Sequence, residues 1–183
     1  MIAKPVGARV LVAGAINTDL VARVPHAPVA GETVTGDRFE IFAGGKASNQ
    51  SVASARSGAT TAILGAVGLD EFGRQRRADL EENGVDCQSV ANVAGTASGV
   101  ALILVEASGQ NRIAYVPGAT ATVTAEQAVS AFARFEPDVV LITLELPLDA
   151  LSALVHAARS AGKSVVLNAA PEPSSGRSLV ASS

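Results

Sequence analysis

Residues 42–59 read FAGGKASNQSVASARSGA, and two glycines stand directly before a run that is mostly alanine, serine and valine. The run predicts a helix over 46–57 that ends at Gly58. Glycine loses more conformational entropy on folding than any other residue. Gly44 and Gly45 therefore indicate either a sharp turn or another group that closely approaches the backbone. The free N–H groups and positive dipole end of this helix would favour polar or anionic groups.

Outward from this stretch, apolar strand-like runs alternate with helical patterns. Continuous apolar runs predict buried parallel strands at 10–16, 62–67, 139–144 and 164–167. Helices are predicted at 46–57, 71–83 and 148–161, and another starts at a Thr124–Gln127 capping box and stops before Pro137. This alternation indicates an α/β fold with a mostly parallel sheet between helices.

Two segments, 17–42 and 96–118, break the alternation. They contain runs rich in Val, Ile, Thr and Tyr at 31–42, 99–106 and 111–117, and EASGQN between the last two predicts a hairpin loop. We expect a small antiparallel sheet inserted into the α/β body, of the kind that covers a site. The four parallel strands are few for such a body. Either the C-terminal tail is disordered or the chain is part of a protein about twice as long, which we favour.

The composition argues against several classes of function. The 183 residues are 48% hydrophobic, carry a net charge of −3 and include five Phe, one Tyr and no Trp. No apolar run is long enough for a membrane span, and the weak acidity with few aromatics argues against nucleic-acid binding. Arg74, Arg76 and Arg77 alternate with acidic residues and predict a solvated helix face. The single Cys87 fits a reducing, cytoplasmic setting.

Four polar side chains follow the predicted parallel strands. Asn17 and Asp19 come after the first strand, Glu145 after the third and Asn168 after the fourth. Ligands of open α/β sheets bind beyond the carboxyl ends of the strands, so we expect these side chains to open onto one crevice. Carboxylates and amides without many bases or aromatics suit a polyhydroxylated ligand. The alternative is that each of them makes a turn or a cap.

Lys46 and Asn49 lie three residues apart, on the same side of the helix start, and no G-x-x-x-x-G-K-[ST] phosphate loop is present. The longer string GGKASNQSVASARSGATTAILGAVGLDEFG (44–73) resembles the first signature region of the ribokinase-like, phosphofructokinase-B type carbohydrate kinases. The stretches 12–46, 98–106 (SGVALILVE), 144–151 (LELPLDAL) and 167–173 (LNAAPEP) keep that family's order and spacing. The resemblance covers nearly the whole chain.

This resemblance implies that residues 1–183 are the N-terminal part of one α/β domain with a small β lid, formed by segments of about 17–42 and 96–118. It implies an ATP-dependent kinase acting on a primary hydroxyl of ribose or a similar sugar. The sugar would be held by Asn17, Asp19, Gly44, Gly45, Lys46 and Asn49, with Glu145 reaching it from the far side and Asn168 towards the nucleotide. A complete member would use ATP, Mg²⁺ and a monovalent cation such as K⁺, and could form a homodimer through the lid sheet.

The chain departs from the family pattern in two ways. Ala47–Ser48 replace the usual Gly-Ala, and Thr120 stands where Asn is common, so ribose in particular is less strongly indicated. The family's GAGD motif with its catalytic aspartate, the anion hole and the acidic motif for Mg²⁺ are absent from the 183 residues. We therefore expect no catalytic or metal-binding residue in this chain, and no catalysis by it alone.

Two other functions remain open at this point. One is a non-catalytic sugar-binding or regulatory protein on a truncated kinase fold. The other is a nucleoside kinase, which would need a more aromatic pocket than this chain offers. Phe42 and Tyr115 are the aromatic candidates nearby, and both fit packing within the lid better.

Overall fold

Six parallel strands form the central sheet of the computed structural model, which describes residues 7–171. They are β1 (Arg9–Ala13), β4 (Thr60–Gly68), β5 (Val85–Asp86), β6 (Val90–Val93), β9 (Val139–Thr143) and β10 (Ser164–Asn168). Their order is β10-β9-β1-β4-β5, and β6 also pairs with β4. The four predicted strands are confirmed. The short strands β5 and β6, of two and four residues, were missed because they carry too few residues for a pattern.

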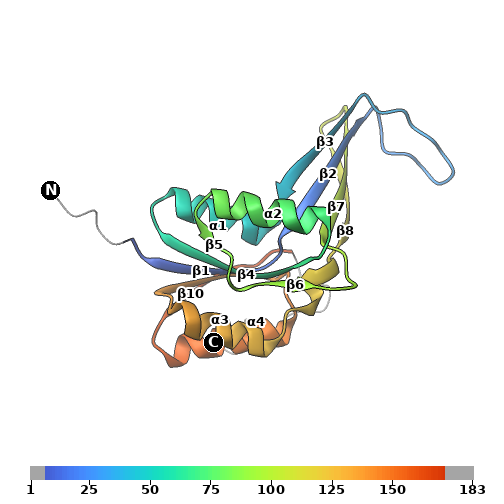
Figure 1. The fold of residues 1–183 in the computed structure, drawn as a ribbon. Coiled ribbons are helices and arrows are strands. Elements are labelled where there is room, and N and C mark those ends of the chain that lie inside the picture. The colour runs from blue at the N-terminus through green and yellow to red at the C-terminus, as the bar shows by residue number, and fades with distance from the viewer. Residues whose placement is uncertain (1–6, 172–183) are drawn as a thin grey trace.

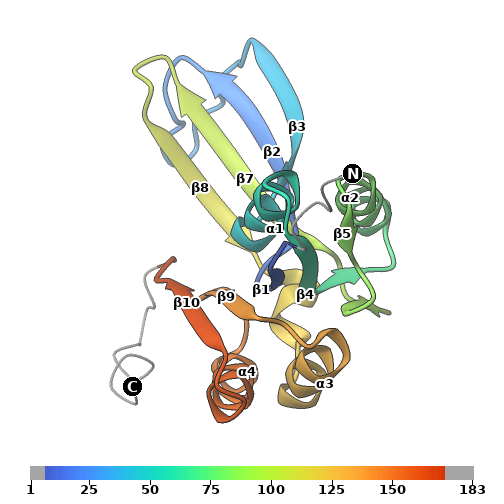
Figure 2. The same ribbon diagram turned by 90° about the vertical axis from the view of Figure 1, so that its left-hand side faces the viewer.

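Helices cover both faces of this sheet (Figure 1). α1 (Lys46–Arg56) and α2 (Glu71–Glu82) lie on one face, and α3 (Ala125–Phe135) and α4 (Leu148–Ser160) lie on the other (Figure 2). The predicted capping box is present at the start of α3. The short 3₁₀ helix η1 (Gly118–Thr122) precedes α3.

Alternate side chains of each central strand pack against the two helical layers. Leu11 and Ile142 belong to the core beneath α3 and α4, while Val12, Ile63 and Val67 belong to the core beneath α1 and α2. Because both faces are buried, the strands read as continuous apolar runs in the sequence. Within residues 7–171, no helix combines the length and apolarity needed to cross a membrane.

A second sheet projects from the α/β body (Figure 2). Its strands, β2 (Asn17–Val24), β3 (Arg38–Gly44), β7 (Gly99–Glu106) and β8 (Asn111–Val116), have the order β3-β2-β7-β8. The hairpin between β7 and β8 is confirmed. The sheet is mixed rather than antiparallel as predicted, because β2 and β7 are parallel with Asn17 opposite Gly99. Both strands leave the central sheet after parallel strands, β1 and β6, and therefore run in the same direction.

The strand predicted at 31–42 begins only at Arg38, and residues 31–37 form no strand. Most of residues 25–37 are exposed, so nothing buries alternate side chains there. The pattern of Val and Thr in this segment was therefore misleading.

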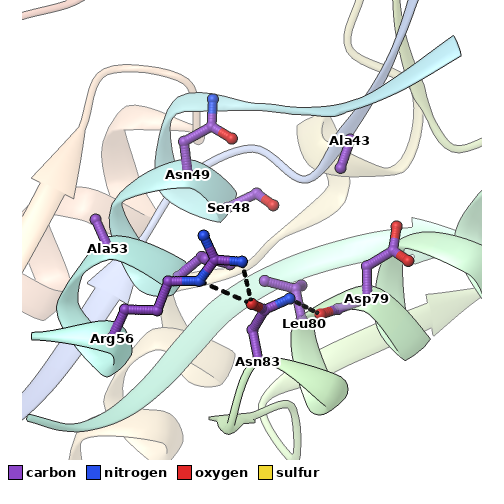
Figure 3. A pocket seen from close by; sticks show the side chains of 9 residues that line it. Ala43, Ser48, Asn49, Ala53, Arg56, Asp79, Leu80 and Asn83 are labelled. Atoms are coloured by element: carbon purple, nitrogen blue, oxygen red, sulfur yellow. Dashed lines mark hydrogen bonds between the residues drawn. The ribbon is translucent and has the colours of Figure 1, made fainter. Parts of the chain in front are cut away.

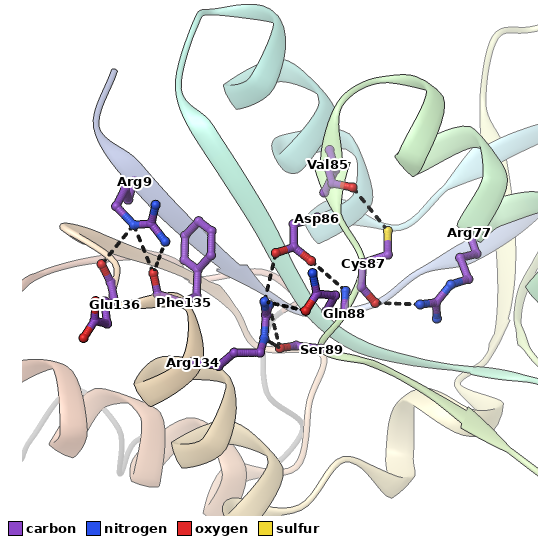
Figure 4. Close-up of polar contacts among 10 residues, drawn as sticks. All are labelled: Arg9, Arg77, Val85, Asp86, Cys87, Gln88, Ser89, Arg134, Phe135 and Glu136. Carbon is purple, nitrogen blue, oxygen red and sulfur yellow. Dashed lines mark hydrogen bonds and ion pairs between the residues drawn. The ribbon is translucent and has the colours of Figure 1, made fainter. Parts of the chain in front are cut away.

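The basic residues of α2 do not form the predicted solvated face. Arg77 donates to the backbone oxygen of Cys87 (2.9 Å; Figure 4). It also donates to the backbone oxygen of Val90 (3.2 Å), at the start of β6. Arg76 is only 8% exposed, and Arg74 alone is highly exposed, as predicted. The prediction failed for Arg76 and Arg77 because their long stems pack along the protein and their heads bond to backbone carbonyls.

Candidate functional site

The Gly44–Gly45 pair lies where the second sheet meets the α/β body. Gly44 ends β3, and Gly45 is the N-cap residue of α1 with φ 92°. A Cβ at Gly44 would lie 2.1 Å from Oδ1 of Asp19, and a Cβ at Gly45 would lie 2.4 Å from the Ala15 oxygen. Both explanations offered by the sequence therefore apply. The backbone turns sharply at Gly45, and other groups closely approach both glycines.

Glu145 connects three parts of this junction. Its Oε1 accepts a hydrogen bond from Lys46 Nζ (3.1 Å), and its Oε2 accepts from Ala15 N (3.2 Å) and Thr143 Oγ1 (3.0 Å). The Glu145 side chain is 3% exposed, whereas that of Lys46 is 42% exposed. The carboxylate thus ties the end of β9 to the segment after β1 and to the first turn of α1. Lys46 keeps donor capacity towards solvent, because its ammonium group has three N–H bonds.

Asn17 and Asp19 lie two residues apart on β2 and so share one face of the second sheet. Asn17 is 5% exposed, and its Oδ1 accepts no hydrogen bond from any described residue. Burial raises the pKa of Asp19. The charges of Lys46 and Arg76 oppose this rise, and the charge of Glu145 adds to it. Asp19 therefore lies within electrostatic reach of the Lys46–Glu145 pair.

Tyr115 and Thr120 also lie at this junction, and the sequence had indicated Tyr115 as a nearby aromatic residue that packs within the lid. Tyr115 lies across the sheet from Ala101, which lies opposite Asp19, so all three side chains share one face. Burial raises the pKa of the Tyr115 phenol and the Glu145 charge adds to this, while the adjacent Asn17 and Thr120 side chains lower it. The Thr120 hydroxyl is buried and has no partner among the described residues.

The start of β7 is held beside Asn17 by Asp70, the N-cap residue of α2. Asp70 Oδ1 accepts from Gly73 N (2.8 Å) and Ser98 Oγ (2.6 Å), and Oδ2 accepts from Ser98 N (2.7 Å). Burial opposes ionisation, but these hydrogen bonds outweigh it and lower the pKa of Asp70. Ser98 precedes Gly99, where a Cβ would lie 2.3 Å from Asn17 Oδ1. The network therefore positions the backbone that abuts Asn17.

The side chains of two predicted site residues, both within residues 7–171, form no hydrogen bond with these groups. Asn49 is exposed and lines a groove of about 360 Å³ between α1 and α2, next to Arg56 and Asn83 (Figure 3). Arg56 donates to Asn83 Oδ1 through Nε (3.1 Å) and Nη2 (2.8 Å) there. Asn168 ends β10, where it is paired in register with Thr143.

The structure thus brings six of the eight predicted residues to one junction. They are Asn17, Asp19, Gly44, Gly45, Lys46 and Glu145. We call these six residues the junction cluster. It combines two carboxylates, one amide, one ammonium and a helix start.

Comparison with known proteins gives consistent matches. The family model for pfkB family carbohydrate kinases matches residues 8–181. The ribokinase of Schizosaccharomyces pombe is 36% identical over 169 residues, which cover 88% of this chain and 53% of that protein. The chain spans about half the length of the curated ribokinases it matches.

Solved structures agree with these matches. The ribokinase of Cryptococcus neoformans in complex with ADP superposes with a TM-score of 0.77 at 30% identity, covering 93% of this chain and 51% of that one. The Arabidopsis thaliana ribokinase complexed with ribose and ATP superposes with a TM-score of 0.76 at 26% identity, covering 88% and 53%.

Proposed function

The chain belongs to the pfkB family of carbohydrate kinases, and from this premise we propose that it is the sugar-binding half of an ATP-dependent kinase acting on a primary hydroxyl of ribose or a similar sugar. The observation that carries the proposal is the junction cluster. In it, the buried Asn17 Oδ1 has no partner among the described residues and lies near Asp19 and the Lys46–Glu145 pair. An unsatisfied buried polar group costs about 1–3 kcal/mol, so a ligand hydroxyl that bonds to Asn17 would be favoured.

The chemistry of the cluster matches a sugar. Each sugar hydroxyl can donate one hydrogen bond and accept others. The Asp19 carboxylate and Asn17 Oδ1 are acceptors, and the Lys46 ammonium is a donor that also bonds to Glu145. Bonds between a carboxylate and a hydroxyl are among the stronger hydrogen bonds. We propose that Glu145 acts from the α/β body and Asp19 from the second sheet, so that the sugar is held between them.

We further propose that the second sheet acts as a lid, formed by segments of about 17–42 and 96–118 of one domain spanning residues 1–183. Phe42 and Tyr115 share the Asp19 face of this sheet and would cover the sugar. Excluding water there would limit wasteful transfer of the phosphoryl group to water. Asn49 would contribute to sugar binding only if it turned from the α1–α2 groove, and Asn168 would lie on the nucleotide side.

The described residues do not fit a metal site. Within residues 7–171, no group of three or more His, Cys, Asp or Glu side chains could hold a metal ion. ATP would supply the phosphoryl group. We propose that ATP, Mg²⁺, a monovalent cation such as K⁺ and the catalytic base depend on the part of the relatives' length that this chain does not span. The 183 residues would then bind sugar without phosphorylating it.

The opposite face of the second sheet supports a homodimer. Phe39, Ile41, Leu102 and Val116 lie on the face away from Asp19 and are 61%, 49%, 48% and 53% exposed. Exposed apolar side chains gathered on one face of a sheet are typical of an interaction surface. We propose that a second copy of the chain covers it, and that the protein works in the cytoplasm.

The test compares the 183-residue chain with its longer reading frame, if one exists, for ADP formation that depends on D-ribose. We expect the chain to bind D-ribose without forming ADP, and the longer protein to form ADP. Ribose-dependent ADP formation by the chain alone would contradict its inactivity, and absence of ribose binding by both would contradict the sugar site. A genuine stop codon after Ser183, combined with ribose binding, would favour a sugar-binding or regulatory protein instead. Binding of inosine in preference to ribose would favour a nucleoside kinase.

A further inference from the structure

Arg76 is a buried cation that lies outside the junction cluster. It lies on α2 with 8% of its surface exposed. Its Nη1 donates to the backbone oxygen of Phe42 (3.0 Å), and its Nη2 forms an ion pair with Asp79 (2.8 Å). Its Nε is buried and has no hydrogen-bond partner among the described residues. Burying a charge is costly unless it is paired, so the contacts with Phe42 and Asp79 are what stabilise an arginine at this position.

The bond to Phe42 joins the α/β body to the second sheet. Phe42 lies on the edge strand β3, directly opposite Asp19 of β2 in the antiparallel register. Two residues later, Gly44 leaves room for the Asp19 carboxylate. Arg76 therefore fixes the strand segment that leads into the Gly44–Gly45 turn and flanks Asp19.

Helix α2 holds both strands that flank β2. Its N-cap residue Asp70 is bonded to Ser98, immediately before β7, and Arg76 is bonded to Phe42 on β3. Because the sheet order is β3-β2-β7-β8, β2 lies between these two anchored strands. The side chains of β2 that face the junction are thus positioned from both sides by one helix.

The charge of Arg76 also reaches Asp19. Burial raises the pKa of Asp19, and the Lys46 and Arg76 charges oppose that rise. The charged and titratable groups that face Asp19 from the surrounding elements are Lys46 of α1, Arg76 of α2, Glu145 after β9 and Tyr115 of β8. Loss of Arg76 would therefore raise the pKa of Asp19 further and leave more of the carboxyl group protonated at a given pH.

We propose that Arg76 is a positioning residue for sugar binding: it anchors β3 to α2 and so holds Asp19 and the Gly44–Gly45 turn in the geometry that binds the sugar. The proposal rests on the proposed function for its sugar-binding part, but not for its anchoring part. The proposal gives Arg76 a role that Arg74 does not have, although the sequence pattern predicted that both lie on a solvated helix face.

The anchoring part is tested without ligand, by hydrogen–deuterium exchange of the 183-residue chain. Arg76→Met should accelerate exchange in β2 and β3 and leave β1 and β4 unchanged, whereas the exposed control Arg74→Met should match wild type. Arg76→Lys keeps the charge and one donor, and it should give a smaller acceleration. If Arg76→Met does not fold, Arg76→Lys alone decides. Wild-type exchange over β2 and β3 in the folded variants would overturn the proposal.

The binding part is tested by calorimetric titration of D-ribose between about pH 5 and pH 8. Arg76→Met should weaken binding about tenfold near neutral pH, because sugar binding must then re-order the released strand at a cost of about 1.4 kcal/mol. The loss should grow as the pH falls, and Arg76→Lys should restore the wild-type pH profile. Unchanged affinity, or equal weakening at every pH, would overturn this part. Absence of ribose binding by wild type would instead overturn the proposed function, and the exchange experiment would still decide the anchoring.

Discussion

Replacing Gly45 with alanine should destabilise the chain much more than the same replacement at Gly58. The two glycines have similar positive φ values, 92° and 95°. A Cβ at Gly45 would lie 2.4 Å from the Ala15 oxygen, whereas a Cβ at Gly58 would meet nothing within 4 Å. The two positions thus share a positive φ and differ sharply in the space around the glycine.

The magnitudes follow from these two costs. Gly58→Ala should lower the free energy of unfolding by about 1–2 kcal/mol, the cost of a left-handed conformation for an L-residue. Gly45→Ala carries at least this strain, since its ψ of 129° lies outside the left-handed helical region. It adds an overpacking cost of about 1–3 kcal/mol, because the strand end and Ala15 must separate. The expected total at Gly45 is therefore about 2–5 kcal/mol.

The assay is urea unfolding of wild type and both variants, followed by far-ultraviolet circular dichroism. The difference between the variants should be about 1–3 kcal/mol, or several degrees in Tm for a chain of this size. Equal free energies of unfolding for Gly45→Ala and Gly58→Ala would refute the reasoning. The close approach of Ala15 would then not be what requires glycine at the start of α1.

Three further predictions concern the surroundings of the junction cluster. Glu145→Gln should lower the free energy of unfolding by about 1–2 kcal/mol in urea unfolding, a modest loss because the Lys46 partner is 42% exposed and can be hydrated. Ribose affinity measured by calorimetry should fall as the pH drops through the raised pKa of Asp19, since only the ionised carboxylate accepts hydrogen bonds from the sugar through both oxygens. Asp19→Asn should remove this pH dependence. Ser98→Ala should lower the free energy of unfolding by about 1–3 kcal/mol in thermal denaturation, because Asp70 Oδ1 loses the hydrogen bond from the Ser98 hydroxyl. An unchanged Tm would contradict a stabilising role for this hydrogen bond.

Local patterns were sufficient to predict most of the α/β body. The four apolar strands and four helices followed from periodicity and capping, including the capping box at Thr124. The parallel pairing of β2 with β7 could not be read from the sequence, because it depends on where two distant segments leave the central sheet. The edge strands β5 and β6 were too short to show a period.

The position of the site was predictable in the same way, but its supporting residues were not. The rule that ligands bind at the carboxyl ends of parallel strands predicted Asn17, Asp19, Glu145 and Asn168 as candidates, and the first three lie in the junction cluster. Nothing local distinguishes Arg76, which is buried against Phe42, from the exposed Arg74 two residues earlier. That difference arises only when the second sheet packs beside α2.

The most direct test of the account is a crystal structure of the 183-residue chain grown with D-ribose. The account predicts the sugar at the junction cluster, with its hydroxyls bonded to Asn17, Asp19 and Lys46. Ribose bound instead in the α1–α2 groove beside Asn49 and Arg56, with the junction left empty, would contradict it.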